Sequence, residues 1–398
     1  MSSITPVIAD LMALIACKSP TPPGDVSPVV DFIVPRLRRA GARVDLPEPE
    51  PGRPNVIATW DFGPGPTLCF NTHTDVNDPA GQAWSTPPFQ GVLDGAGRRV
   101  YGRGACDAKG SLAAMLAAVE ALAADATGLS GRLVLTAVMG EEAGGVGTLH
   151  LVRSGFRADA AVVGEPTNLK VLSAHKGTFM RKVAIRGRSA HSGQADLGRN
   201  AIHDAAALVA RWEALDARLR DRPHPRVGRP SAQATLITGG TRQNTIPESA
   251  TLVLDRRLVP GETHELARAE LAAILVELSE SRPGFSLAGV EELVATLPSE
   301  TPADTPIVEL ALAARNARLA PPQQEPGGFP GGCDMGKLRL LAGIPTVILG
   351  PGSLDEAHVP DEFVEVAEVV AAAGVYEDIA RRCLARPERV EEVDHTRG

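Results

Sequence analysis

The stretch LVLTAVMGEEAGG, residues 133–145, runs from a continuous apolar segment into two adjacent carboxylates, Glu141 and Glu142. The apolar segment, residues 133–139, has the length and composition of a buried strand, and glycines mark a turn after it. Neighbouring side chains of an extended backbone point to opposite sides, and two like charges side by side repel one another. We therefore expect Glu141 and Glu142 to perform two different tasks at the end of a buried strand.

Short apolar runs of the same kind recur along the chain and alternate with alanine-rich helical stretches. Runs at 67–70, 160–163 and 345–349 predict further buried strands, and residues 111–126 predict a helix. This alternation is typical of an α/β protein in which helices flank a mostly parallel central sheet.

The pattern changes between residues 178 and 293 to strand, helix, strand, strand, helix, strand. This βαββαβ order predicts a compact α+β unit of the ferredoxin-like type, with helices on one face of an antiparallel sheet. Further α/β sequence follows it. We therefore expect residues 178–293 to form a domain inserted into a discontinuous catalytic domain, residues 1–177 and 294–398.

Composition narrows the functional classes. The chain has 398 residues, 43% of them hydrophobic, and a net charge of -8, so a nucleic-acid partner, which needs a basic surface, is not expected. The five cysteines are scattered without a Cys-x-x-Cys pair, which argues against a disulfide framework and against a cysteine zinc site. No run has the length and apolarity of a membrane span, and LIAC at 14–17 makes a poor signal peptide. The sequence predicts a cytoplasmic protein without a membrane partner.

A histidine or a carboxylate follows nearly every predicted strand. Taken singly each is a weak signal, because a lone histidine near a strand end is more often structural or solvated. The carboxyl ends of parallel strands share one edge of an open sheet, however, so these segments are expected to converge. The residues concerned are His73 and Asp75 after the first run, Asp107 just before the 111–126 helix, Glu141 and Glu142 after the second run, Glu165 after the third and His358 after the last.

The converging set contains donors that zinc accepts, imidazole nitrogen and carboxylate oxygen. Three carboxylates and two imidazoles are too many for one catalytic zinc, which keeps a position open for water. They suit two metal ions about 3.5–4 Å apart that share a bridging group. Asp107 is the expected bridge.

Eight motifs in order resemble the two-zinc aminoacylase and acetylornithine deacetylase group of metallopeptidases, which also contains succinyl-diaminopimelate desuccinylases and glutamate carboxypeptidases. The resemblance covers nearly the whole chain, and an ordered set is far more specific than any one element. The motifs are THTDV, YGRGACDAKG, MGEEAGG, GEPT, AHKGTF, GRSAHSGQADLGRNAI, QNTIPESATLVLDRRLVPGE and GIPTVILGPGSLDEAHVPDE.

The resemblance implies a catalytic domain of the zinc-peptidase type that holds two zinc ions per chain. His73 and Glu165 would hold one ion, Glu142 and His358 the other, and Asp107 would bridge them. Cobalt or manganese is an expected substitute, because the same ligands accept several divalent ions.

The resemblance also implies roles for two further carboxylates. Asp75 would hydrogen-bond the far ring nitrogen of His73 and fix its tautomer. Glu141 would be the general base that takes a proton from zinc-bound water during attack on an amide carbonyl and hands it to the departing amine. A cis peptide between Asp107 and Ala108 is expected as well.

The inserted domain is expected to act as a lid and to form a homodimer. His191 resembles a histidine that reaches across from the partner subunit to stabilise the oxyanion, and Asn244 a polar group at the same place. Arg257 resembles an arginine that clamps a substrate carboxylate, a task that suits its bidentate hydrogen bonding. The plainer alternatives are a surface histidine, a capping asparagine and a surface arginine paired with an acid.

The segment 331–338 leaves the identity of the substrate undecided. GGCDMGKL, residues 331–338, is expected to line the acyl or side-chain pocket from Gly331 onward. Cys333 and Met335 stand where many members of the group show Thr-Asp-Ala-Arg. Cys333 has a plainer reading as a small buried hydrophobe, which is the commoner fate of a free cysteine.

The sequence therefore predicts a metal-dependent amidohydrolase that removes an acetyl, succinyl or formyl group from a small-molecule N-acyl amino acid. The AHKG and GPGSLDEAHVPDE segments look most like acetylornithine deacetylase. A carboxypeptidase or dipeptidase with the same machinery is the alternative among enzymes, and a non-catalytic metal-binding or ligand-binding relative is the alternative outside them. A nucleotide-dependent enzyme is not expected, because the sequence lacks a glycine-rich phosphate loop.

Overall fold

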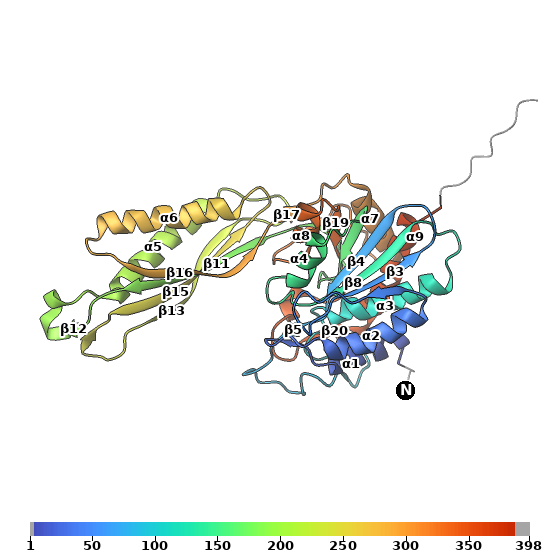
Figure 1. Ribbon diagram of the computed structural model, residues 1–398, viewed down its shortest axis with the longest axis horizontal. Helices are drawn as coiled ribbons and strands as arrows, with labels where there is room; N and C mark the ends of the chain where they lie inside the picture. Colours follow the sequence, from blue (N-terminus) through green and yellow to red (C-terminus); the bar gives the residue numbers. More distant parts are fainter. Residues whose placement is uncertain (1–3, 387–398) are drawn as a thin grey trace, which may run out of the picture.

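The protein consists of two lobes in a computed structural model that describes residues 4–386. A rounded lobe contains the central sheet and both described ends of the chain, and an elongated lobe carries two long helices over a second sheet (Figure 1). The outermost parts of the predicted catalytic domain, residues 1–3 and 387–398, lie outside the described residues.

The rounded lobe is built on a nine-stranded mixed sheet in the order β17-β10-β19-β9-β4-β8-β3-β2, with β18 paired to β10. The four central strands β19, β9, β4 and β8 are parallel neighbours, as the alternating sequence pattern predicts. The strands are β2 (Arg43–Asp45), β3 (Val56–Asp61), β4 (Thr67–His73), β8 (Arg132–Val138), β9 (Ala160–Val163), β10 (Leu172–His175), β17 (Ser299–Glu300), β18 (Gly327–Phe329) and β19 (Thr346–Ile348).

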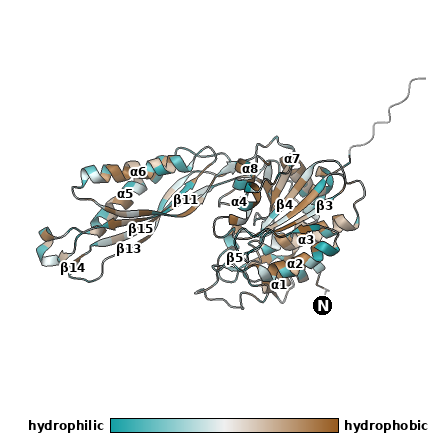
Figure 2. Ribbon diagram, viewed as in Figure 1, coloured by the Kyte–Doolittle hydropathy of each residue, from teal (hydrophilic) through white to brown (hydrophobic). Residues whose placement is uncertain are grey.

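Two layers of helices cover this sheet. Side chains alternate along β4, so that Leu68 and Phe70 belong to one hydrophobic cluster and Cys69 belongs to another. Hydrophobic colour accordingly runs along the central strands (Figure 2). The first cluster includes α1 (Pro6–Ala16), α2 (Ser27–Arg39), α3 (Lys109–Ala124), α7 (Pro306–Arg318) and α9 (Val366–Cys383), and the second includes α4 (Val146–Arg153) and α8 (Met335–Leu341).

The elongated lobe is an antiparallel four-stranded sheet in the order β13-β15-β11-β16. Helices α5 and α6 enclose its own hydrophobic core, in which Trp212 is fully buried. The elements are β11 (Gly177–Arg186), α5 (Ala201–Leu219), β13 (Ser231–Gly239), β15 (Ser249–Leu258), α6 (His264–Ser281) and β16 (Leu287–Thr296), in the predicted order.

Small ladders complete both lobes. At the tip of the elongated lobe β12 pairs with β14, and in the rounded lobe β1 pairs with β5 while β20, β7 and β6 form a three-stranded sheet. These elements are β1 (Pro20–Thr21), β5 (Val76–Asn77), β6 (Val92–Leu93), β7 (Arg99–Tyr101), β12 (Ala190–His191), β14 (Thr245–Ile246) and β20 (Phe363–Glu365), with short helices η1 (Ser192–Leu197) and η2 (Leu354–Glu356).

The two lobes are joined by two short connections that lie against each other. One connection passes from β10 to β11 and the other from β16 to β17. A Cβ atom at Gly177 would collide with Pro298 and with the carbonyl of Thr296, so only glycine allows the connections to approach this closely. Among the described residues, none of the helices is long and apolar enough to cross a membrane.

Candidate metal centre and active site

The predicted site residues of the rounded lobe meet at one edge of the central sheet. His73 is the last residue of β4, Glu142 lies in the turn after β8, and Glu165 follows β9. Asp107 lies two residues before the start of α3, and His358 lies in the segment between β19 and β20. The parallel strands thus bring separate parts of the chain to one place.

The Asp107 carboxylate lies between the two histidines. Its Oδ1 atom is 3.0 Å from His73 Nε2, and its Oδ2 atom is 3.2 Å from His358 Nε2. His358 Nε2 is also 3.0 Å from Glu142 Oε1. The expected cis peptide between Asp107 and Ala108 is present.

These residues form two groups that could each hold a cation. One group is His73, Asp107 and Glu165, the other is Asp107, Glu142 and His358, and within each group the donor atoms lie within 4.8 Å of one another. The first group is buried, whereas His358 is 44% exposed. A set of imidazole nitrogens and carboxylate oxygens that share one carboxylate fits two divalent ions of the zinc, cobalt or manganese type.

In the metal-free protein, raised pKa values favour the protonated forms of three side chains in the cluster, which reduces its negative charge. Hydrogen bonds to Asp107 and Glu142 raise the pKa of His358 to about 11. Burial lowers the pKa of His73, but the hydrogen bond to Asp107 and the charge of Glu165 outweigh it and raise the pKa well above its usual value. Burial and the charge of Asp107 raise the pKa of Glu165 well above its usual value.

Asp75 does not make the contact that the resemblance implies. The Nδ1 atom of His73 lies 2.9 Å from the main-chain carbonyl of Asp75, while the Asp75 carboxylate is 3.7 Å away. Because a carbonyl only accepts, His73 carries a proton on Nδ1, and Nε2, which faces Asp107, is the nitrogen that would bind a cation once it is deprotonated. The tautomer is therefore fixed by the backbone.

The Asp75 carboxylate instead organises the turn that carries the two glutamates. It accepts the main-chain N–H groups of Glu141 at 3.1 Å and Glu142 at 3.2 Å, and the hydroxyl of Thr21 at 3.0 Å. Register explains this geometry, because His73 pairs with Val138 and the loops after both strands run side by side.

Glu141 and Glu142 occupy different positions within that turn. Glu142 belongs to one of the two groups that could hold a cation, and Glu141 belongs to neither group. Glu141 lines the cavity next to the metal groups, where burial raises its pKa to about 8. A carboxylate with a raised pKa that faces a cavity is suited to accept a proton.

The cavity has a volume of about 310 Å³ and lies at the junction of the two lobes. The predicted substrate residues Arg257 and Gly331 both line it, whereas Cys333 and Met335 are buried behind it in a hydrophobic cluster. Other walls come from Thr178, Val294 and Thr296 of the elongated lobe and from Phe329, Gly332 and Leu354 of the rounded lobe.

Neighbouring side chains hold Arg257 in place. Its Nε and Nη2 atoms donate to Asp255 Oδ2 at 3.1 and 3.0 Å, and Nη1 donates to Thr178 Oγ1 at 3.1 Å. Arg257 is thus paired with an acid, Asp255, as the plainer alternative proposes. Its side chain also lines the cavity.

The structure does not bring His191 and Asn244 to the metal groups of their own chain. Both are exposed at the tip of the elongated lobe, where the Ser192 N–H donates to the carbonyl of Asn244 at 2.9 Å. Figure 1 shows β12 at the end of this lobe that lies farthest from β4. Within one chain these residues therefore form a separate cluster.

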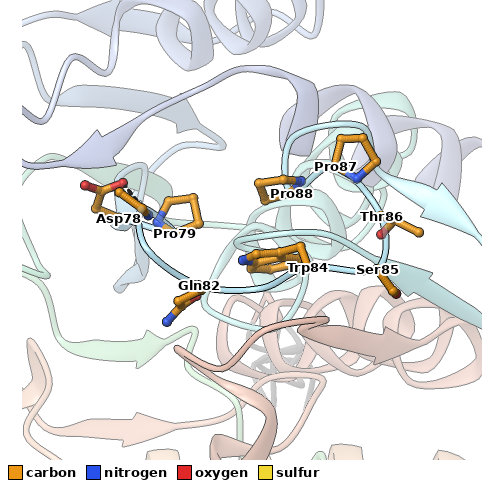
Figure 3. A pocket seen from close by; sticks show the side chains of 9 residues that line it. Asp78, Pro79, Gln82, Trp84, Ser85, Thr86, Pro87 and Pro88 are labelled. Atoms are coloured by element: carbon orange, nitrogen blue, oxygen red, sulfur yellow. Dashed lines mark hydrogen bonds between the residues drawn. The ribbon is translucent and has the colours of Figure 1, made fainter.

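A second depression, of about 680 Å³, is formed by the loop after β5 (Figure 3). Asp78 is the only ionisable side chain among its described lining residues. Gln82 of this loop donates to the carbonyl of His358 at 2.9 Å, and the Ser85 N–H donates to Asp361 at 2.8 Å. The loop thus braces the segment that carries His358.

Glu362 is a supporting residue that the sequence analysis missed. Its fully buried Oε1 atom accepts the N–H groups of Gly104, Cys106 and Asp107 at 3.0, 2.9 and 3.1 Å, and Arg103 Nη1 donates to Oε2 at 2.7 Å. Burial raises the pKa of Glu362 to about 7, although the charge of Arg103 lowers it. The one available signal was the acidic pair at the end of the HVPDE segment.

An Arg103→Met variant should destabilise the protein, and more strongly at high pH. Without the guanidinium the folded-state pKa of Glu362 rises further above its unfolded value, so stability is lost as the pH increases between these two values. We expect a loss of about 3–5 kcal/mol in the free energy of unfolding at pH 8.5 and a smaller loss at pH 5.5, measured by urea denaturation. An equal loss at both pH values would contradict this role.

Residues 69–382 match the family described as peptidase family M20/M25/M40. The chain is 32% identical to an acetylornithine deacetylase of Klebsiella pneumoniae, a match that spans 78% of each chain. It is 31% identical to an acetylornithine deacetylase of Myxococcus xanthus, over 87% of this chain and 90% of the relative.

Solved structures share the fold. An M20 family metallo-carboxypeptidase of Sulfolobus solfataricus superimposes with a TM-score of 0.79 at 19% identity, over 95% of this chain and 99% of the other. A dinuclear metal-binding M20 peptidase of Bacillus subtilis superimposes with a TM-score of 0.70 at 16% identity, over 95% and 97%. With the sequence matches spanning most of its length, the chain belongs to peptidase family M20/M25/M40.

Proposed function

We propose that the protein is a metal-dependent amidohydrolase that removes an acetyl, succinyl or formyl group from an amino acid or a similar small amine with a carboxylate. The observation that carries this proposal is the Asp107 carboxylate, which turns one oxygen toward His73 and the other toward His358 and so joins two donor groups. The names of the acetylornithine deacetylase relatives support the reaction class, hydrolysis of a linear amide.

Two divalent ions per chain would occupy these groups, with zinc as the preferred ion and cobalt or manganese as substitutes. His73 and Glu165 would hold one ion, Glu142 and His358 the other, and Asp107 both. When bound, such ions polarise an amide carbonyl and lower the pKa of water to the neutral range.

The protein side chains around the ions handle the proton and the substrate. Glu141 takes the proton from the attacking water and delivers it to the departing amine, since it lies in the cavity without belonging to a metal group. Arg257 binds the substrate carboxylate from the opposite wall of the cavity, where Asp255 and Thr178 fix its orientation. The Asp75 carboxylate positions Glu141 and Glu142 by holding their N–H groups.

We assign residues 1–177 and 294–398 to a catalytic domain and residues 178–293 to an inserted lid and dimerisation domain. The separate hydrophobic core of the elongated lobe supports this division. The enzyme acts in the cytoplasm, a location that agrees with its five free cysteines.

We further propose a homodimer in which His191 and Asn244 of one chain complete the site of the other. Their exposed position at the tip of the elongated lobe supports action on a second chain. Strand β13 lies at an open sheet edge, and its Leu236 and Ile237 are 55% and 53% exposed beside α5. An exposed apolar strand edge of this kind is a pairing surface.

A Glu141→Gln variant should keep its metal and lose its activity. Because Gln cannot accept the proton, we expect kcat to fall by about 100-fold or more while two ions per chain remain. The measurements are turnover on N-acetyl, N-succinyl and N-formyl amino acids and on dipeptides, with metal analysis. The neighbouring Glu142→Gln variant is the control, which should lose metal, and kcat within a few fold of wild type in Glu141→Gln would refute the assignment.

Metal binding should release protons and tighten as the pH rises. His358, with a pKa of about 11, and His73, whose pKa is also raised, are protonated in the metal-free protein and must be deprotonated to bind a cation. Calorimetric zinc titrations in buffers of different ionisation enthalpy should count about one or more protons released per ion. An affinity that does not change between pH 6 and pH 8 would contradict these ligands.

A charge at the β13 edge should separate the dimer. Placing carboxylates on this exposed apolar edge, in a Leu236→Glu, Ile237→Glu double variant, should give monomers in sedimentation velocity. Turnover should be greatly reduced, because the site of each chain then lacks His191 from a second chain. Val276→Glu is the matched control, since Val276 is also 55% exposed on the same lobe but lies on α6. A double variant that remains dimeric, or that is monomeric with full activity, would exclude this arrangement.

A further inference from the structure

A buried ion pair lies behind the turn that carries Glu141. Lys337 Nζ is 3.0 Å from Asp334 Oδ1, and the side chains are only 13% and 2% exposed. Both residues belong to the segment 331–338 but lie outside the described lining of the cavity. Burying two charges is costly unless their hydrogen bonds are satisfied, so a pair at this place calls for a reason.

The ion pair is anchored to the central sheet. Asp334 Oδ2 accepts the hydroxyl of Thr148 in the first turn of α4 at 2.6 Å, where the helix dipole also favours a negative charge. Asn71 of β4 donates to Thr148 Oγ1 at 3.3 Å and to Thr136 Oγ1 of β8 at 3.0 Å. A chain of polar contacts thus fixes Lys337 relative to β4 and β8, the strands from which His73 and Glu141 extend.

The Glu141 turn rests directly against this pair. The turn from Gly140 to Gly145 is closed by main-chain hydrogen bonds, among them Gly145 N–H to the carbonyl of Gly140 at 2.8 Å. A Cβ atom at Gly145 would collide with both Lys337 Nζ and Asp334 Oδ1. Gly145 also has a φ of 72°, a conformation that favours glycine, so the sequence EEAGG allows the turn to reach the ammonium group.

Lys337 and Glu141 interact electrostatically across this contact. Burial lowers the pKa of Lys337, but the charges of Asp334 and Glu141 outweigh burial and raise it, so the side chain is a cation. Asp334 contributes most to this stabilisation of the cation, and Glu141 contributes next. His73 is the stronger cation at Glu141, so Lys337 is linked to Glu141 mainly by the packing of the turn against the ion pair.

We infer that Lys337, held by Asp334, is a positioning residue that sets the Glu141 carboxylate in its place at the cavity. This inference rests on the proposed function, because it concerns the placement of the proposed base. The role is distinct from metal binding, since Lys337 belongs to neither metal group. It also gives the buried pair its reason: the pair forms a fixed surface against which the turn with two adjacent glutamates packs.

The test is a Lys337→Met variant compared with Lys337→Arg, which keeps the charge. Because only the placement of the base changes, we expect Lys337→Met to lower kcat by about 10- to 100-fold and to leave KM within about threefold, with two ions per chain retained. Lys337→Arg should recover kcat to within about fivefold of wild type. A purely structural role would lower the melting temperature without this separation of kcat from KM.

The matched control is Arg36→Met. Arg36 is 15% exposed and pairs with Asp10 and Glu120 on α1 and α3, away from the cavity. Its loss should reduce stability and leave kcat unchanged. If Arg36→Met lost as much kcat as Lys337→Met, the effect would be general destabilisation and the inference would be overturned.

An Asp334→Asn, Lys337→Met double variant covers the case in which Lys337→Met does not fold, because it leaves no buried carboxylate unpaired. We expect the same loss of kcat in the double variant. A folded form of either variant with kcat within about twofold of wild type overturns the inference. Absence of turnover by the wild-type enzyme on every amide would instead count against the proposed function.

Discussion

The site depends on the placement of the Asp107 carboxylate between two histidines. Asp107, Glu142 and Glu165 lie close together, and Coulomb repulsion between carboxylates disfavours such a group unless protons or cations compensate for it. The protein holds the group together through the backbone. Glu362 accepts three N–H groups of the loop that ends in Asp107, and Asp75 accepts those of Glu141 and Glu142. Two fully buried carboxylates thus fix the loops, which leaves the side chains on them free to bind other groups.

The register of the parallel strands determines how His73 and Glu165 are placed relative to each other. His73 pairs with Val138 on one side of β4, and Asn71 pairs with Val163 on the other. Glu165, two residues beyond Val163, therefore comes level with His73 if the strand directions continue. This arrangement explains why the convergence of these residues at one edge is predictable from the sequence: hydrophobic runs locate the strands, and parallel pairing brings their ends together.

What the sequence could not predict depends on contacts between distant loops. Arg103 reads as part of an ordinary glycine turn, yet it is buried against a glutamate 259 positions away. Asp75 lies two residues from His73, and alternation places both on one side, but the position of the 140–145 turn decides that its carboxylate binds main-chain N–H groups. Lys337 lies in the segment 331–338, in which Cys333 and Met335 are the residues that depart from the pattern of the resembled family. The proposed role of Lys337 follows from the contact of this segment with α4, which the sequence alone does not predict.

Residues of both lobes line the cavity. The way a substrate fits the cavity therefore depends on how the two lobes are placed relative to each other. Arg257, Thr178 and Thr296 belong to the elongated lobe, whereas Asp107 and Glu141 belong to the rounded lobe. Two chain connections, packed against each other at Gly177 and Pro298, join the lobes. A substrate whose carboxylate binds Arg257 while its amide lies at Asp107 therefore fixes the distance between the lobes. Under the proposed function, the length of the amine between these two groups would then determine whether the amide comes within reach of Glu141.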